Sequence, residues 1–281
     1  RMPYAAIQGI EGSFHHAAAR DYLGEGVEVC PCLSFSELIH RVEQGSADVG
    51  VMAVENTIAG SLLPNYRLIV KTPLYIVGEV YAHIRQNLMA LPGQTLNDIK
   101  SVHSHPIALE QCREYFEDKP EIRLVESEDT ALSAREISEQ QLKGRAAIAG
   151  NTAAELYDLE IMAKGIETNK VNYTRFWVLS RDINPSGRHI NKASLSFILQ
   201  HRTGQLSEVL SILASQQINL TKIQSLPRIG TAWEYHFFID VLFEDYARYS
   251  RAISAIRPLT EELMILGEYA EGAKKNTTVI G

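Results

Sequence analysis

Short apolar strands alternate with amphipathic helices through the first part of the chain, and this alternation most constrains the fold. The strand-like segments are YAAIQG (4–9), VEVCPCL (27–33), DVGVMAVEN (48–56), SVHSHP (101–106), IRLVES (122–127) and RAAIAG (145–150). Helical patterns lie between them, and Ser34 and Glu37 form an S-x-x-E capping box ahead of one of these helices. The alternation predicts an α/β architecture with parallel strands covered by helices on both faces.

Polar residues follow the carboxyl ends of several predicted strands. These groups are Gln8-Gly9, Glu55-Asn56-Thr57, Ser104-His105-Pro106 and Asn151-Thr152. In open α/β sheets the loops after the strands form the ligand crevice. We therefore expect a binding site built from these loops.

A change in composition separates a second unit. The stretch RDINPSGRHINK (181–192) has no periodicity and is typical of a linker. The segments after it predict strand, helix, strand, strand, helix and strand, at 193–200, 204–217, 218–226, 233–243, around 252–256 and near 263–266. This βαββαβ order is ferredoxin-like. We expect a catalytic domain over 1–181, a linker over 182–192, the ferredoxin-like domain over 193–272 and a tail over 273–281.

The bulk properties indicate a soluble globular protein of the cytoplasm. The formal net charge is −7 and the pI is near 5.8, which argues against nucleic-acid and membrane partners because both need a concentrated basic surface. No apolar run is long enough to span a bilayer. The three cysteines have no metal-ligand spacing, and we interpret them as buried thiols in a reducing compartment.

Several stretches, in a fixed order, resemble the prephenate dehydratases that carry a C-terminal ACT regulatory domain. The stretches are IQGIEGSF (7–14), ENTIAGSLLPNY (55–66), SHPIALEQC (104–112), GNTAAELYDL (150–159) and NYTRFWVL (172–179), followed by GQLSEVLSILASQQINLTKIQSLP (204–227) and WEYHFFID (233–240). Each motif is weak alone, but together they cover nearly the whole chain.

The resemblance implies a catalytic domain of two lobes, similar to a periplasmic binding protein, with the active site in the cleft between them. The implied reaction converts prephenate to phenylpyruvate with release of CO2 and water, without a metal or an organic cofactor. The resemblance also implies feedback inhibition by L-phenylalanine and a dimer or tetramer. The aromatic strand 233–243 is expected to be exposed and to favour this self-association.

The stretch NYTRFWVL carries the residues expected to be catalytic. The resemblance implies that Thr174 donates a proton to the departing hydroxyl, although a β-branched strand residue is the plain alternative. Arg175 suits carboxylate binding, or a salt bridge that holds the cleft together. Alternation along a strand should send Thr174 and Arg175 to opposite faces. Phe176 either packs on the substrate ring or belongs to the core, and Glu55 is expected to orient Arg175 or other donors.

The remaining substrate-binding predictions follow the quoted motifs. They are Gln8, Gly9, Asn56, Thr57, Gly60, Ser61, Ser104, His105, Asn151 and Thr152. Glu55-Asn56-Thr57 with Gly60-Ser61 is interpreted as a loop that enters a helix and offers backbone N–H groups to a carboxylate. Helix capping is the structural alternative for several of these residues.

The effector residues implied by the resemblance lie in the second domain. They are Gly204, Gln205, Leu206, Asn219, Leu220, Gln224, Ser225, Leu226 and Pro227. The family's GAL and ESRP motifs stand here as Gly-Gln-Leu and Gln-Ser-Leu-Pro, so the domain could also serve dimerisation alone. Two other functions remain open: dehydration of arogenate, and a non-catalytic amino-acid sensor.

Overall fold

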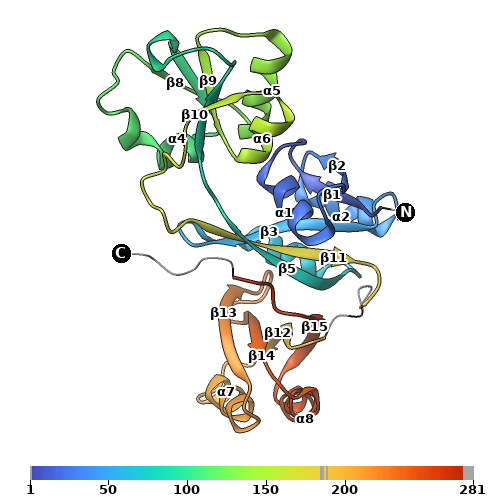
Figure 1. Ribbon diagram of the computed structural model, residues 1–281. Coiled ribbons are helices and arrows are strands. Elements are labelled where there is room, and N and C mark those ends of the chain that lie inside the picture. Colours follow the sequence, from blue (N-terminus) through green and yellow to red (C-terminus); the bar gives the residue numbers. More distant parts are fainter. Residues whose placement is uncertain (1, 184–186, 188, 275–281) are drawn as a thin grey trace.

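The computed structural model describes residues 2–183, 187 and 189–274. Within these residues the strands form three sheets of six, five and four strands, and each sheet belongs to one part of the molecule (Figure 1). The first two sheets are the two lobes of the N-terminal domain, and the third is the sheet of the C-terminal domain. The predicted α/β class with a following βαββαβ unit is confirmed.

The first lobe is built on the six-stranded sheet, with the order β2-β1-β3-β11-β5 and β4 paired to β3. Its strands are β1 (Tyr4–Gln8), β2 (Glu28–Cys32), β3 (Val49–Asn56), β4 (Gly60–Ser61), β5 (Tyr75–His83) and β11 (Tyr173–Ser180). Its helices are α1 (Phe14–Leu23), α2 (Phe35–Glu43) and α3 (Leu63–Val70). Helix α1 packs on one face of the sheet, and α2 and α3 pack on the other.

The sheets are mixed, not purely parallel as the alternation predicts. Strands β1, β2 and β3 are parallel, whereas β11 runs antiparallel to both β3 and β5. The reason is that β11 returns from the second lobe and inserts between two strands that precede it. Ser34 caps α2 as predicted, through its Oγ and the Glu37 N–H at 3.1 Å, while the Glu37 carboxylate accepts from the Leu33 N–H.

The second lobe contains the five-stranded sheet, in the order β10-β6-β9-β7-β8. Its elements are β6 (Asn87–Ala90), η1 (Leu96–Asp98), β7 (Ser101–Ser104), α4 (Pro106–Gln111), η2 (Arg113–Phe116), β8 (Arg123–Glu126), α5 (Thr130–Gln140), β9 (Arg145–Ala149), α6 (Asn151–Leu156) and β10 (Glu160–Ala163). The chain crosses between the lobes twice, after β5 and before β11, and the crossings lie side by side (Figure 1). The Ile84 N–H donates to the Asn172 carbonyl at 2.7 Å and joins them.

The C-terminal domain follows at Lys192. Its elements are β12 (Lys192–Leu199), α7 (Gln205–Ser215), β13 (Asn219–Pro227), β14 (Tyr235–Leu242), α8 (Tyr246–Ile256), η3 (Arg257–Leu259) and β15 (Glu261–Tyr269). The four-stranded sheet has the order β13-β14-β12-β15. Helices α7 and α8 cover one of its faces, and the other face lies against the six-stranded sheet (Figure 1).

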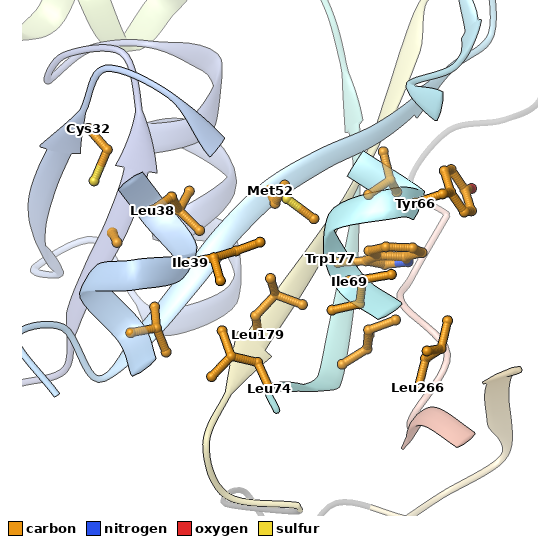
Figure 2. Packing of buried hydrophobic residues seen from close by; sticks show 14 of the residues in the cluster. Cys32, Leu38, Ile39, Met52, Tyr66, Ile69, Leu74, Trp177, Leu179 and Leu266 are labelled. Carbon is orange, nitrogen blue, oxygen red and sulfur yellow. The ribbon is translucent and has the colours of Figure 1, made fainter. Parts of the chain in front are cut away.

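One hydrophobic core is shared by the first lobe and the C-terminal domain. Figure 2 shows Trp177, Ile69 and Tyr66 of the first lobe in the same cluster as Leu266 of β15. The Tyr66 ring lies 5.1 Å from both Trp177 and Phe238. Two sheets that bury such a layer together are held in a fixed relation to each other.

Two predictions, about a free strand edge and about a loop, are wrong. The aromatic strand predicted at 233–243 is β14, an interior strand between β13 and β12, so its backbone edges are already paired, although Trp233 and Tyr235 at its start are exposed. The free edge near it belongs to β13. The segment 55–61 is not a loop that enters a helix, because Glu55 and Asn56 end β3, Gly60-Ser61 forms β4, and α3 begins only at Leu63.

Gly267 allows β15 to approach β5. A Cβ atom at this position would lie 2.0 Å from the Ile76 carbonyl oxygen and 2.6 Å from the Ile76 Cβ. Real Cβ atoms do not come that close to backbone, so only glycine fits where the two domains meet.

Replacing Gly267 by alanine is therefore expected to loosen the contact between the domains. Overpacking of this kind costs ~1–3 kcal/mol, which lowers Tm by roughly 2–10 °C in a thermal melt. Gly26→Ala is the matched control, since its Cβ would meet only the flexible end of Met2. Equal melting of both variants would contradict this account of the interface.

Candidate active site

Thr174 and Asn56 form a hydrogen-bonded pair across neighbouring strands. Their Cα positions are partners in the β11–β3 register, and the Asn56 Nδ2 donates to the Thr174 Oγ1 at 3.0 Å. The backbone N–H groups of Ile58 and Ala59 donate to the Asn56 Oδ1 at 2.9 and 3.0 Å. These two donors fix which end of the amide faces Thr174.

The orientation of this amide determines what the threonine hydroxyl can do. Because Asn56 presents its NH2 group, the Thr174 oxygen acts as an acceptor in this contact. A hydroxyl has one proton and two lone pairs. The Thr174 proton is therefore free of this contact and can be donated to a third group, as the departing oxygen of a substrate requires.

The crossing segment before β11 reinforces the pair. The Asn56 Nδ2 also lies 2.9 Å from the Asn172 Oδ1. The Thr57 N–H donates to the Tyr173 carbonyl, and the Thr57 hydroxyl donates to the Val171 carbonyl, both at 3.0 Å. Residues predicted from separate motifs are thus joined where the chain returns from the second lobe. Asn172 is a site residue that the sequence predictions missed, although it lies in the NYTRFWVL stretch.

Arg175 points to the opposite face of the sheet, as strand alternation predicts. Thr174 and Phe176 lie on the α1 face, while Arg175 and Trp177 lie on the face covered by the C-terminal domain. The Arg175 side chain is only 2% exposed. Its Nε donates to Glu79 at 2.8 Å, its Nη1 to Asp240 at 2.5 Å and its Nη2 to the Tyr269 hydroxyl at 2.9 Å.

Glu55 belongs to the same buried ion network. It accepts from the Arg175 Nη1 at 3.3 Å and from the Lys222 Nζ. The expectation that Glu55 orients Arg175 agrees with this contact. Arg175 was interpreted either as a carboxylate ligand or as part of a salt bridge that holds the cleft together. The structure contains a salt bridge, but it joins the first lobe to the C-terminal domain and does not lie within the cleft.

The charged groups in this network shift one another's pKa values. Burial opposes the charged form of Arg175, but Asp240, Tyr269 and Glu79 outweigh it and hold the guanidinium pKa well above its usual value. Burial alone would raise the pKa of Asp240, but Arg175 and Lys192 outweigh it and hold that pKa below its usual range. Both groups therefore carry charge at neutral pH.

The loop after β1 lies against the second lobe. A Cβ atom on Gly9 would lie 2.9 Å from the Asp129 Oδ2, and one on Gly12 would lie 3.1 Å from the Tyr157 ring. The Tyr157 hydroxyl donates to the Glu11 carbonyl. Gln8 and Gly9 of the first lobe thus lie at the junction of the lobes.

Three residues predicted to bind substrate have structural roles in the second lobe. Ser104 is fully buried and donates to the Ile148 carbonyl at 2.7 Å. His105 caps α4 through its Nδ1, which accepts from the Ile107 N–H at 3.1 Å. The Asn151 Oδ1 accepts from the Asn87 Nδ2 at 3.1 Å, and no sequence pattern pointed to Asn87. Thr152, the next residue on α6, is partly exposed.

Phe176 belongs to the core. Its side chain is 1% exposed and packs in the cluster beneath α1. The His15 ring meets it edge-on, with centroids 5.0 Å apart, and the His15 Nε2 accepts from the Ala53 N–H at 3.2 Å. The core interpretation of Phe176 therefore holds.

The predicted effector residues occupy opposite ends of the C-terminal sheet. Asn219 and Leu220 begin β13, next to Leu242 and Val241, whereas Pro227 ends it beside Tyr235. Gly204, with φ of 80°, starts α7 after β12, and β12 ends beside Tyr235. The Asn219 end lines a pocket of about 510 Å³. Within one chain the two groups of residues are therefore separated by the length of the sheet.

Among the described residues, no group of three His, Cys, Asp or Glu side chains could hold a metal ion. Cys30, Cys32 and Cys112 are buried free thiols, as predicted. No helix in the same residues is both long and apolar enough to cross a bilayer.

The fold and the site define a two-lobed α/β enzyme followed by a ferredoxin-like domain. A family model described as prephenate dehydratase matches residues 5–184, and one described as ACT domain matches residues 193–245. A bifunctional chorismate mutase/prephenate dehydratase of Aquifex aeolicus is 33% identical, over 94% of this chain and 72% of its own length. The chain belongs to the prephenate dehydratase family.

Other relatives extend this comparison. An arogenate dehydratase/prephenate dehydratase of Arabidopsis thaliana is 35% identical, over 94% of this chain and 72% of its own length. The structure of a prephenate dehydratase of Arthrobacter aurescens in complex with L-Phe has a TM-score of 0.83 and 29% identity, covering 95% of this chain and 89% of that one. GqqA, described as a novel type of quorum quenching acylase, has a TM-score of 0.84 and 30% identity, covering 95% and 98%.

Two adjacent histidines are expected to make the fold sensitive to acid. Burial lowers the pKa of His15 to about 4, and burial with the nearby Arg20 does the same for His16. In the unfolded chain both return to about 6.5. Between these values the unfolded chain binds more protons, so the free energy of unfolding must fall as the pH is lowered from about 6.5 to about 4.

Urea denaturation across this pH range measures the effect. The His15→Gln, His16→Gln double variant keeps an acceptor at each position but does not titrate there, and it is expected to lose much of the slope. An unchanged slope in the double variant would contradict the assignment.

Proposed function

We propose that this protein converts prephenate to phenylpyruvate, CO2 and water, with Thr174 as the proton donor. The observation that carries the proposal is the Asn56–Thr174 contact, in which the amide donates and leaves the hydroxyl proton available. Membership of the prephenate dehydratase family gives the substrate class.

The reaction needs one proton and a fixed substrate. The carbon–carbon bond to the ring carboxylate breaks, its electron pair enters the ring, and the ring hydroxyl leaves. Donation from Thr174 lets that hydroxyl depart as water, and a proton taken up from solvent restores the Thr174 hydroxyl. Because the product ring is aromatic, the main requirements are positioning and one hydrogen-bond donor.

We propose that the substrate binds at the junction of the lobes. Thr174 and Asn56 would meet it from the first lobe together with Gln8 and Gly9, and Thr152 would meet it from the second. Arg175 is not assigned to a substrate carboxylate, because its guanidinium is buried and donates to four partners. Ser104 and His105 are not assigned to the substrate, because each is hydrogen-bonded within the second lobe.

Two other activities have support among the relatives. Dehydration of arogenate would use the same donor, so a kinetic comparison of the two substrates decides between them. Amide hydrolysis by a hydroxyl nucleophile, as the description of GqqA suggests for that protein, needs a base that accepts the hydroxyl proton. Asn56 presents a donor to Thr174, and this favours the dehydratase.

Replacing Thr174 by alanine is expected to lower kcat/KM for prephenate by ~10²–10⁴-fold, because the proton donor is lost. Formation of phenylpyruvate measures the rate. Thr174→Ser is the matched control, since it keeps the hydroxyl, and it should retain much more activity than the alanine variant. Equal activity of the alanine variant and the wild type would exclude Thr174 as the donor.

We further propose that two copies of the chain build the effector site for L-phenylalanine. Strand β13 is an edge of its sheet, so two copies can pair antiparallel along it. Such pairing brings Asn219 and Leu220 of one copy near Gly204, Gln205 and Leu206 of the other. The assignment of the effector rests on the ACT domain match and on the L-Phe complex of the relative.

L-Phenylalanine is accordingly expected to raise Tm and to lower the rate of phenylpyruvate formation, since it binds the folded dimer. Both effects should be weakened by Asn219→Ala, which removes a side chain from the proposed site. A millimolar effector that changes neither Tm nor rate would leave the domain with a role in dimerisation alone.

The proposed organisation keeps a catalytic domain over 1–181 and a regulatory domain over 193–272. Most of the predicted tail, 275–281, lies outside the described residues. We assign the protein to the cytoplasm, which the free thiols of Cys30, Cys32 and Cys112 support.

A further inference from the structure

Strands β3 and β11 carry two linked pairs of residues on opposite faces of one sheet. On one face Asn56 donates to Thr174 at 3.0 Å. On the other face their sequence neighbours Glu55 and Arg175 form an ion pair at 3.3 Å. The register places Arg175 opposite Glu55 and Thr174 opposite Asn56. A shift of Glu55 or Arg175 along its strand must therefore also move Asn56 or Thr174.

The C-terminal sheet contacts both Glu55 and Arg175, each through a side chain of opposite charge. Asp240 of β14 accepts from the Arg175 Nη1 at 2.5 Å. Lys222 of β13 donates to the Glu55 carboxylate and, at 2.7 Å, to the Ser61 hydroxyl on β4. Lys222 and Asp240 are themselves direct partners across β13 and β14. Glu55, Arg175, Lys222 and Asp240 thus lie together between the sheets and are joined by three ion pairs.

A third strand of each sheet closes the network. Glu79 of β5 is fully buried and accepts from the Arg175 Nε at 2.8 Å and from the Lys192 Nζ at 2.9 Å. Ser194 of β12 donates to the Asp240 Oδ1 at 2.6 Å. Three cations and three carboxylates balance in this layer: Arg175, Lys192 and Lys222 with Glu55, Glu79 and Asp240.

Buried charges are costly to separate from their partners, so such a network favours one geometry over nearby ones. Hydrophobic burial is non-directional, so the ion pairs add a directional constraint to the shared core. Here Lys222 and Asp240 fix where Glu55 and Arg175 lie.

We propose that Lys222 and Asp240 are positioning residues for the Asn56–Thr174 pair. They touch no reacting atom and act through Glu55 and Arg175, and the inference rests on the proposed role of Thr174. Lys222 also lies between Leu220 and Gln224 on the edge strand β13. A ligand or a second copy that displaces β13 therefore moves Lys222, and the ion pairs carry that displacement to the site.

Lys222 is the residue to change, because its side chain, at 17% exposed, is the least buried of the three cations in the network. Lys222→Met removes the charge and keeps the length, while Lys222→Arg keeps the charge. A misplacement of ~1 Å can cost up to ~10²-fold in rate. We expect Lys222→Met to lower kcat for prephenate about 3- to 10-fold with KM within about 2-fold. Lys222→Arg should restore most of the loss.

Arg248→Met is the matched control, because it removes an ion pair that lies within α8 and its cap, 3.9 Å from Asp245. It should leave kcat unchanged. Wild-type kcat in Lys222→Met would overturn the proposal. The proposal would also be overturned if Arg248→Met lowered kcat as much as Lys222→Met does. It would be overturned as well if Lys222→Met changed KM and not kcat.

Hydrogen exchange of the peptide 172–180 gives a readout that does not depend on catalysis. Exchange in this peptide should be faster in Lys222→Met than in the wild type, and Lys222→Arg should restore protection. Unchanged exchange would overturn the proposal that Lys222 is a positioning residue. If the wild type forms no phenylpyruvate but exchange responds as expected, the positioning by Lys222 stands and the proposed function fails.

Discussion

The salt bridge between Arg175 and Asp240 is the contact on which the arrangement of this molecule depends. It joins an interior strand of one sheet, β11, to an interior strand of another, β14, with both side chains nearly inaccessible to water. A buried guanidinium without its carboxylates would be strongly destabilising. The first lobe and the C-terminal domain therefore depend on each other, since each supplies a charge that the other needs.

The same contact explains why β11 is half polar and half apolar. Residues from Phe176 to Leu179 are buried on both faces, beneath α1 and above the C-terminal sheet. At the entrance of the strand, alternation sends the Thr174 hydroxyl toward one side and the Arg175 guanidinium toward the other. A single dipeptide thus provides the proposed proton donor and the anchor that holds its strand.

Local patterns in the sequence predicted the strands and helices that alternate regularly, because helix caps and strand alternation depend on near neighbours, but they missed β5, β6 and β10. Ser34 caps its helix as expected, and Thr174 and Arg175 lie on opposite faces as period-two alternation requires. The direction and neighbours of the strands depend on distant parts of the chain. The insertion of β11 between β3 and β5 and the interior place of β14 were therefore not predicted. Nor could the sequence indicate that Asp240 and Lys222 complete the surroundings of residues far from them in the chain.

We propose that the ion pairs on one face of the sheet act through the Asn56–Thr174 pair on the other. A double-mutant cycle on kcat measures this coupling, with Lys222→Met introduced into the wild type and into Thr174→Ala. Lys222→Met is expected to slow the wild type and to have little further effect once the Thr174 hydroxyl is gone. An equal fold-loss in both backgrounds would show that Lys222 affects the rate by another route and would contradict the coupling.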